Sequence, residues 1–153
     1  KSYNGVCMKF INTEDIAESE KRYDPFVLRL SEMYLIRAEA ACHEGDLTAA
    51  ADDIATLEAR ARGVKVSDIN LVYANADELD AIIMNERIKE LFLEGHRLFD
   101  ITRRHETLSR DTGCGSSLLS MTFPDDRFIL PIPLVELDAN KDMQPNPLNS
   151  TKR

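Results

Sequence analysis

The sequence lacks the features that mark membrane-spanning and nucleic-acid-binding proteins. No stretch approaches the roughly 20 consecutive apolar residues that a membrane-spanning helix needs. Basic residues occur in runs no longer than two, and the formal net charge is −8. Because binding to phosphates requires clustered Lys and Arg, we expect no nucleic-acid partner.

Cysteine is scarce, with Cys7, Cys42 and Cys114 widely separated in the chain. An odd number cannot pair completely within one chain, and no C-x-x-C occurs. Free cysteine is among the most buried residue types. We therefore expect free thiols, with Cys42 buried on a helix, and the sequence leaves the redox compartment open.

Histidine is equally scarce, at three residues. Closed metal sites use three or four protein ligands, and no His-Glu-x-x-His motif is present. Neither Glu39 with His43 nor Glu94 with His96 has the Glu-x-x-His spacing of di-iron bundles. The sequence therefore predicts neither a metal site nor a cofactor.

The 153 residues, 43% apolar and 30% charged, are typical of one globular domain. We expect residues 1–23 to be a lead-in, in which Val6–Ile11 is a short strand or an extended segment. Asp24-Pro25 is a helix-start pattern, predicting a helix from there to about Glu44. Two apolar stripes on this helix indicate burial against more than one neighbour: Val27, Leu30, Tyr34, Ala38 and Ala41, and beside them Met33, Ile36 and Ala40.

A tight turn follows this helix. Gly45 closes it and Asp46 caps a second helix that runs to about Arg62, so the pair forms an antiparallel αα-hairpin. The core stripe of the second helix is predicted as Leu47, Ala50, Ile54, Leu57 and Ala61. The large and small residues around the Gly-Asp turn partly match a tetratricopeptide repeat, although Arg37 and Leu57 replace its usual Leu and Ala.

We expect a second hairpin to begin at Asp77, with one helix to about Glu94 and another from His96 to about Arg104. Gly95 provides a corner with a positive φ between them. Glu86, Glu90 and Glu94 lie four apart, so they share a face that Arg87, Lys89 and Arg97 neutralise through i,i+3 and i,i+4 pairs. The opposite face is the apolar stripe Met84, Ile88, Leu91 and Phe92.

Helical periodicity stops at His105, and Gly and Ser residues indicate a long loop to Asp126. Arg127–Leu130 is predicted to be extended, and Pro131 and Pro133 exclude a central strand. Pro133 opens one helical turn over Leu134–Asp138. The remaining tail is expected to be irregular.

Patterns that could carry catalysis have simpler explanations. Asp111-Thr112-Gly113 copies the aspartic-peptidase triplet, but that chemistry needs two carboxylates sharing a proton on β-rich lobes, and this chain is helical. The glutamate row stands on one helix beside arginines, whereas glycosidase carboxylates face each other across a cleft. We predict no catalytic residues and therefore no enzyme.

Four separated motifs, in the same order, resemble the SusD/RagB family. Across residues 24–148 they are Arg29–Ala40 with Gly45-Asp46, then Asn85–Arg87 with Glu94–Asp100, then Leu130–Pro133 with Glu136, Asp138 and Asn140, and finally Asn146-Pro147. The resemblance implies a mainly all-α fold of tetratricopeptide-like hairpins, with helical hairpins over residues 24–104 and a long irregular C-terminal region over 105–153. Family members are several times longer, so the resemblance implies a single domain, residues 1–153, that is a C-terminal fragment of a SusD-like protein.

The resemblance also implies a function. Members of this family are non-catalytic nutrient-binding lipoproteins of the Bacteroidetes outer membrane, which pass glycans or other nutrients to a TonB-dependent SusC-like transporter. We therefore expect surface localisation through a lipidated cysteine upstream of Lys1. Glycan sites in the family rest on aromatic platforms, and this sequence has no Trp. We expect the ligand site to lie outside this fragment, which serves mainly as scaffold.

Seven residues of the family motif are assigned a structural role at the helix corner: Glu86, Arg87, Glu94, Gly95, His96, Arg97 and Asp100. Direct ligand contact is the alternative role of Glu94, His96, Arg97 and Asp100. Two other functions stay open: a helical-repeat adaptor that binds a partner peptide between hairpins, and a hydrolase that uses Asp111 or the glutamates. Turnover lost on Asp111→Asn or Glu90→Gln would identify the hydrolase, and independent solubility without a lipoprotein signal would identify the adaptor.

Overall fold

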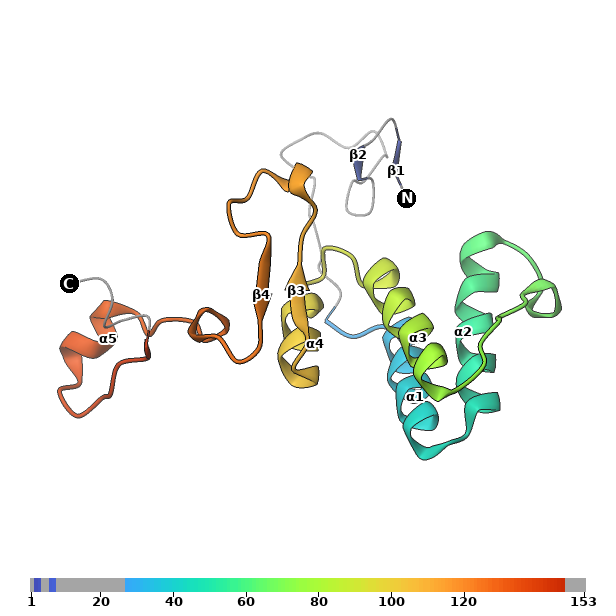
Figure 1. The fold of residues 1–153 in the computed structure, drawn as a ribbon, viewed down its shortest axis with the longest axis horizontal. Helices are drawn as coiled ribbons and strands as arrows, with labels where there is room; N and C mark the ends of the chain where they lie inside the picture. Colours follow the sequence, from blue (N-terminus) through green and yellow to red (C-terminus); the bar gives the residue numbers. More distant parts are fainter. Residues whose placement is uncertain (1, 4–5, 8–26, 148–153) are drawn as a thin grey trace.

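The computed structural model describes residues 2–3, 6–7 and 27–147, and within them the fold is mainly helical, as predicted (Figure 1). Its helices are α1 (Leu30–Glu44), α2 (Leu47–Arg62), α3 (Ala76–Glu90), α4 (His96–Arg104) and α5 (Leu134–Ala139). Two antiparallel strand pairs complete it, β1 (Ser2–Tyr3) with β2 (Val6–Cys7) and β3 (Thr107–Ser109) with β4 (Ser120–Thr122). In the described part of the chain, no helix is long and apolar enough to cross a bilayer.

The α1–α2 turn forms as predicted. Gly45 has φ 87°, a left-handed conformation that glycine adopts without steric cost. The Asp46 backbone N–H donates to the Ala41 carbonyl at 2.9 Å, and the Asp46 carboxylate accepts from the Ala49 N–H at 3.1 Å. The turn thus satisfies the free ends of both helices, which then run antiparallel in Figure 1.

Helices α1, α2 and α3 enclose the first hydrophobic core, whose fully buried large side chains are Leu35, Ile54, Leu79 and Ile83. Tight packing of this kind supplies most of the stability of short helices. At the α1–α2 contact, Arg37 donates to the buried Asp53 carboxylate at 2.6 and 2.7 Å. Arg37, which departs from the tetratricopeptide pattern, therefore forms an ion pair that connects the two helices.

The predicted apolar face of α1 is wrong in part. Leu35, in neither predicted stripe, is fully buried, whereas Leu30 is 71% exposed and Ile36 48% exposed. Helix α1 begins at Leu30, because Arg29 is extended, and Val27 precedes it and is 86% exposed. The predicted start at Asp24-Pro25 lies outside the described residues. The face that packs against α2 and α3 carries Leu35 and Cys42 together with Ala38, and of these only Ala38 is in a predicted stripe.

The region between α3 and α4 also differs from the prediction. Helix α3 ends at Glu90, not Glu94, and residues 91–95 form a turn in which Leu93 has φ 63° and Gly95 has φ 84°. Helix α4 buries Ile101 in a second core, with Met121 and Phe128, rather than completing a second apolar helical hairpin. The cause is its composition, because four of its nine residues are Arg or Asp and Ile101 packs against the β3–β4 strands.

The predicted loop from His105 to Asp126 contains the β3–β4 hairpin, in which Leu108 lies opposite Met121. The extended run predicted at Arg127–Leu130 is wrong in part, since Asp126–Phe128 is a 3-10 turn, whereas Ile129 after it has an extended backbone. The Asp125 carboxylate accepts from the Arg127 backbone N–H at 2.9 Å and favours this turn. The short helix after Pro133 is confirmed as α5.

Gly95→Val tests the predicted corner. A Cβ at Gly95 would meet no atom within 4 Å, so the cost comes from φ 84° rather than from a clash. We expect a loss of about 1–3 kcal/mol in the free energy of unfolding, measured with urea. Gly113→Val is the matched control, because a Cβ there is also unobstructed and its φ is not positive. Equal stability of the two variants would contradict the requirement for a left-handed corner.

Candidate functional site

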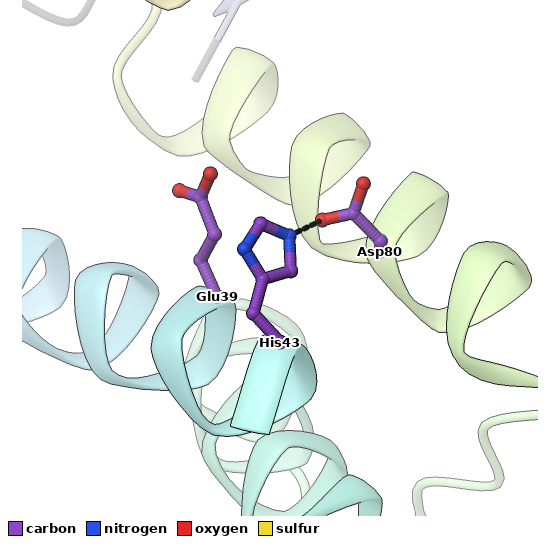
Figure 2. Close-up of side chains that lie close together, drawn as sticks. All are labelled: Glu39, His43 and Asp80. Atoms are coloured by element: carbon purple, nitrogen blue, oxygen red, sulfur yellow. Dashed lines mark ion pairs between the residues drawn. The ribbon is translucent and has the colours of Figure 1, made fainter. Parts of the chain in front are cut away.

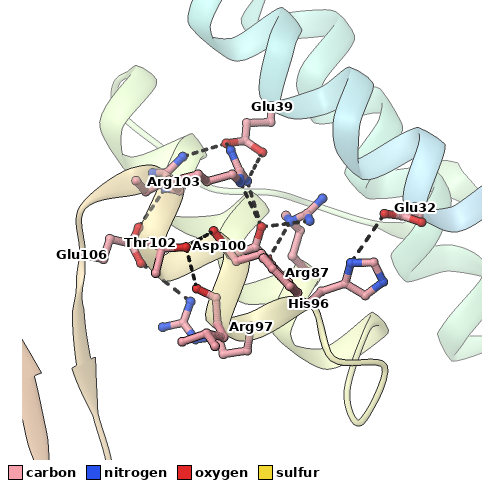
Figure 3. Close-up of polar contacts among 12 residues, drawn as sticks. Glu32, Glu39, Arg87, His96, Arg97, Asp100, Thr102, Arg103 and Glu106 are labelled. Carbon is pink, nitrogen blue, oxygen red and sulfur yellow. Dashed lines mark hydrogen bonds and ion pairs between the residues drawn. The ribbon is translucent and has the colours of Figure 1, made fainter. Parts of the chain in front are cut away.

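Helix α4 is attached to α3 by a buried ion pair between two predicted motif residues (Figure 3). Arg87 donates two hydrogen bonds to Asp100, from Nη2 at 3.0 Å and from Nε at 3.2 Å. Both side chains are 6% exposed, and Asp100 also accepts from Arg103 Nε at 3.0 Å. This two-pronged geometry fixes the orientation of α4 as well as its position.

A second set of bonds ties α4 to α1. Glu39 of α1 accepts from both terminal nitrogens of Arg103 at 2.7 Å, and from Arg104 at 2.9 Å. Burial alone would raise the pKa of Glu39, but the hydrogen bonds from these arginines lower it overall. Arg104 also donates to Asp80 of α3 and to Glu106. Glu39 is therefore held charged by α4, and Arg104 connects α4 to both α1 and α3.

Arg29 organises a third set of contacts, at the end of α3. Its guanidinium lies 2.9 Å from Glu94 and donates to both the carboxylate and the backbone carbonyl of Glu90. Arg60 of α2 adds a bond to Glu90 at 2.7 Å. Burial would raise the pKa of Glu90, but hydrogen bonds from Arg29, Arg60 and Ser31 lower it to about 2. The carboxylate therefore stays ionised although it is largely buried.

The glutamate row is ion-paired, as predicted, but its partners differ from the prediction. The i,i+3 pair of Glu86 with Lys89 forms, at 3.1 Å. Glu90 and Glu94 are instead held by Arg29, which lies 61 and 65 positions away in the chain. Because α3 ends at Glu90, Glu94 lies on the turn and leaves the helix face that the four-residue spacing predicted.

The structure brings the remaining motif residues into the same region. His96 Nδ1 lies 3.6 Å from Glu32 of α1, and Arg97 lies 3.6 Å from Glu106. Sequence reasoning missed Arg29 as an organising residue, although it is the first residue of the family-like segment. No local pattern could have identified its role, since its partners lie on a distant helix and turn.

Three potential metal ligands, Glu39, His43 and Asp80, lie within 4.8 Å of one another (Figure 2). His43 Nε2 is 3.4 Å from Asp80. Arg104 already donates to both carboxylates, and Arg103 to Glu39. Because a divalent cation would have to sit beside these guanidinium groups, the arrangement favours an ion-pair layer over a metal centre.

The α3–α4 turn borders a pocket of about 460 Å³, which we call the elbow pocket. Its walls are mostly apolar, and the residues that line it are Ile88, Leu91, Phe92, Leu93, Leu98, Gly95, Arg87, His96, Arg97 and Asp100. Sequence analysis did not predict it, because it depends on the early end of α3 and on the positive φ of Leu93. It is the cavity that the family-like motif encloses.

Other candidate residues are not arranged as a catalytic site. Asp111 is exposed, and its carboxylate accepts from the adjacent Thr112 hydroxyl at 3.3 Å, as in a solvent-facing loop. Cys42 is buried and free, as predicted, and its thiol donates to the Ala76 carbonyl at 3.4 Å. Cys114 is free and exposed.

Comparison with known proteins identifies relatives of this chain. The sequence model of the SusD family matches residues 1–148. A crystal structure of a proposed sugar-binding protein from Bacteroides vulgatus ATCC 8482 is 32% identical, with a TM-score of 0.66. The alignment covers 79% of this chain but 28% of that protein, so this chain spans less than a third of its length. No curated protein matches the chain.

Removal of one partner from the Arg87–Asp100 pair should be strongly destabilising. We expect Arg87→Leu to lower the free energy of unfolding by about 3–5 kcal/mol, because Asp100 is left buried with fewer donors. The double variant Arg87→Leu/Asp100→Leu should recover part of this loss. A double variant as unstable as the single one, in urea titrations, would contradict the pair as the cause.

The stabilising effect of Glu90 should depend on pH. Its pKa is lowered from 4.5 to about 2 in the folded state, so its contribution is complete above pH 4.5 and disappears as the pH falls towards 2. We expect Glu90→Gln to cost on the order of 2 kcal/mol at pH 7 and almost nothing near pH 2. Glu136→Gln, at an exposed position on α5, is the control. A stability gap for Glu90→Gln that is constant with pH would contradict the ion-pair assignment.

Proposed function

The chain belongs to the SusD family, and we propose that it is the scaffold portion of a nutrient-binding protein whose ligand is a glycan. The proposed sugar-binding activity of the Bacteroides vulgatus relative supports a sugar as the ligand class. The protein acts by binding and not by catalysis. The nutrient passes to a TonB-dependent SusC-like transporter. The protein acts on the outer face of the outer membrane, where a lipid anchor holds it.

The observation that carries the scaffold role is the bonding of the family motif. Arg87 and Asp100 are buried and bonded to each other, and Glu94 is bonded to Arg29. A side chain held by such internal bonds would have to break them to contact a sugar. The motif therefore serves to orient α4 on α1 and α3.

The length comparison supports a division of roles within a longer protein. This chain spans 28% of the relative, and we propose that it is one domain, the C-terminal portion, of a longer SusD-like protein. The elbow pocket is framed by the motif, and its walls are mostly apolar, while two of its polar residues, Arg87 and Asp100, are already bonded to each other rather than free to bind a sugar. The glycan site accordingly lies in the remainder of the protein.

Glycan titrations test this assignment. We expect the 153-residue chain to bind neutral oligosaccharides with dissociation constants of about 1 mM or weaker in isothermal titration calorimetry. Chromatography of the same mixtures should recover the oligosaccharides intact. Sub-millimolar affinity would contradict the scaffold role, and oligosaccharide cleavage that is lost in Asp111→Asn or Glu90→Gln would replace binding with hydrolysis.

A further inference from the structure

The elbow pocket lies within a larger apolar surface. Around it, Leu93 is 60% exposed, Leu98 37% and Ile88 39%, and Phe99, which directly follows Leu98 on α4, is 70% exposed. Apolar surface that continues beyond a pocket is typical of a protein interface, in which the pocket receives one anchoring side chain. A small ligand inside the pocket would leave Phe99 in water.

The polar groups of the pocket favour a mainly apolar occupant. Arg87 and Asp100 bond to each other at 3.0 and 3.2 Å, so their hydrogen-bonding capacity is largely used. Leu91, 4% exposed, and the neighbouring leucines supply no donor or acceptor from their side chains. A leucine or phenylalanine side chain would gain from this environment, because burial of its surface needs no compensating hydrogen bond.

Arg97 gives the rim of the pocket a positive charge. Its side chain is 43% exposed, and its ion pair with Glu106 is long, at 3.6 Å. This contrasts with the formal net charge of −8 for the whole chain. A partner with an acidic residue beside its apolar anchor would be attracted to this rim, and a basic partner would be repelled.

We propose that the elbow pocket is a docking site for an acidic amphipathic helix, which inserts a leucine or phenylalanine into the pocket and pairs a carboxylate with Arg97. The source of the helix is the remainder of a longer SusD-family chain. This chain spans 28% of its relative, so most of such a protein is available to cover the surface. One amphipathic helix matches both the apolar walls and the charged rim.

Two fluorescent peptides test the proposal with the 153-residue chain. Both are helical 16-residue peptides with the same leucine and phenylalanine face, flanked by glutamates in one and by lysines in the other. Fluorescence anisotropy should give tighter binding of the glutamate peptide, by about fivefold at low salt, as expected for an exposed charge pair. Arg97→Glu should reverse this preference.

The apolar half of the proposal needs separate variants. Leu98→Ser should weaken binding of the glutamate peptide by about thirtyfold, the effect of removing a central interface contact. Leu93→Asn is a second variant, chosen because asparagine tolerates the φ of 63° at this position and so preserves the turn. Val135→Ser, at a 77% exposed position on α5, is the matched control and should leave binding unchanged.

Three results would overturn the proposal. Equal affinity of the chain for the two peptides would contradict the role of Arg97. Unchanged affinity of the Leu93→Asn variant for the glutamate peptide, with a native circular dichroism spectrum of the variant, would contradict the apolar anchor site. A dimer in sedimentation velocity that Leu98→Ser dissociates would assign the surface to a second copy of this chain. Weak glycan binding by the same chain leaves the result unaffected, so this test is independent of the glycan assignment.

Discussion

The fold depends on buried and partly buried guanidinium–carboxylate bonds between α4 and the α1–α3 core. Each side has its own hydrophobic core, the first around Leu35 and Ile83 and the second around Ile101. Arg87–Asp100 and the Glu39 bonds to Arg103 and Arg104 join the two. Charges taken out of water are costly unless fully paired, so this layer tolerates few relative positions of α4. Apolar contact alone would allow α4 to adopt several positions on the core.

The contacts of Arg29 explain why the corner has its observed form. An α-helix leaves its last carbonyls without partners, and Arg29 donates to the Glu90 carbonyl at the end of α3. The same guanidinium holds the Glu90 and Glu94 carboxylates. The chain therefore leaves the helix at Glu90 and turns at Leu93 and Gly95 before α4 begins. One side chain from the start of α1 thus fixes both the end of α3 and the following turn.

Local chemistry made part of this structure predictable. The Gly45–Asp46 turn, the end of α2 at Gly63 and the left-handed Gly95 each depend on residues adjacent in sequence, and all are found. The partners of Glu90 and Glu94, the burial of Leu35 and the packing of α4 depend on residues brought together by the fold. The elbow pocket belongs to the second group. The pocket forms because α3 ends at Glu90, about one turn before the end that its sequence pattern predicts.

The two sides of the α3–α4 corner differ in burial and polarity, and we therefore assign them different roles. On the inner side, charged groups such as Asp100 are buried and bonded, so a substitution there acts first on stability. On the outer side, Phe99 and Leu93 remain in contact with water, so a substitution there leaves the core unchanged. Folding of this chain accounts for the inner residues but gives no stabilising reason for the outer ones. A surface of this kind is explained by the contact that covers it, and in a family of longer chains the adjoining helices can provide that contact.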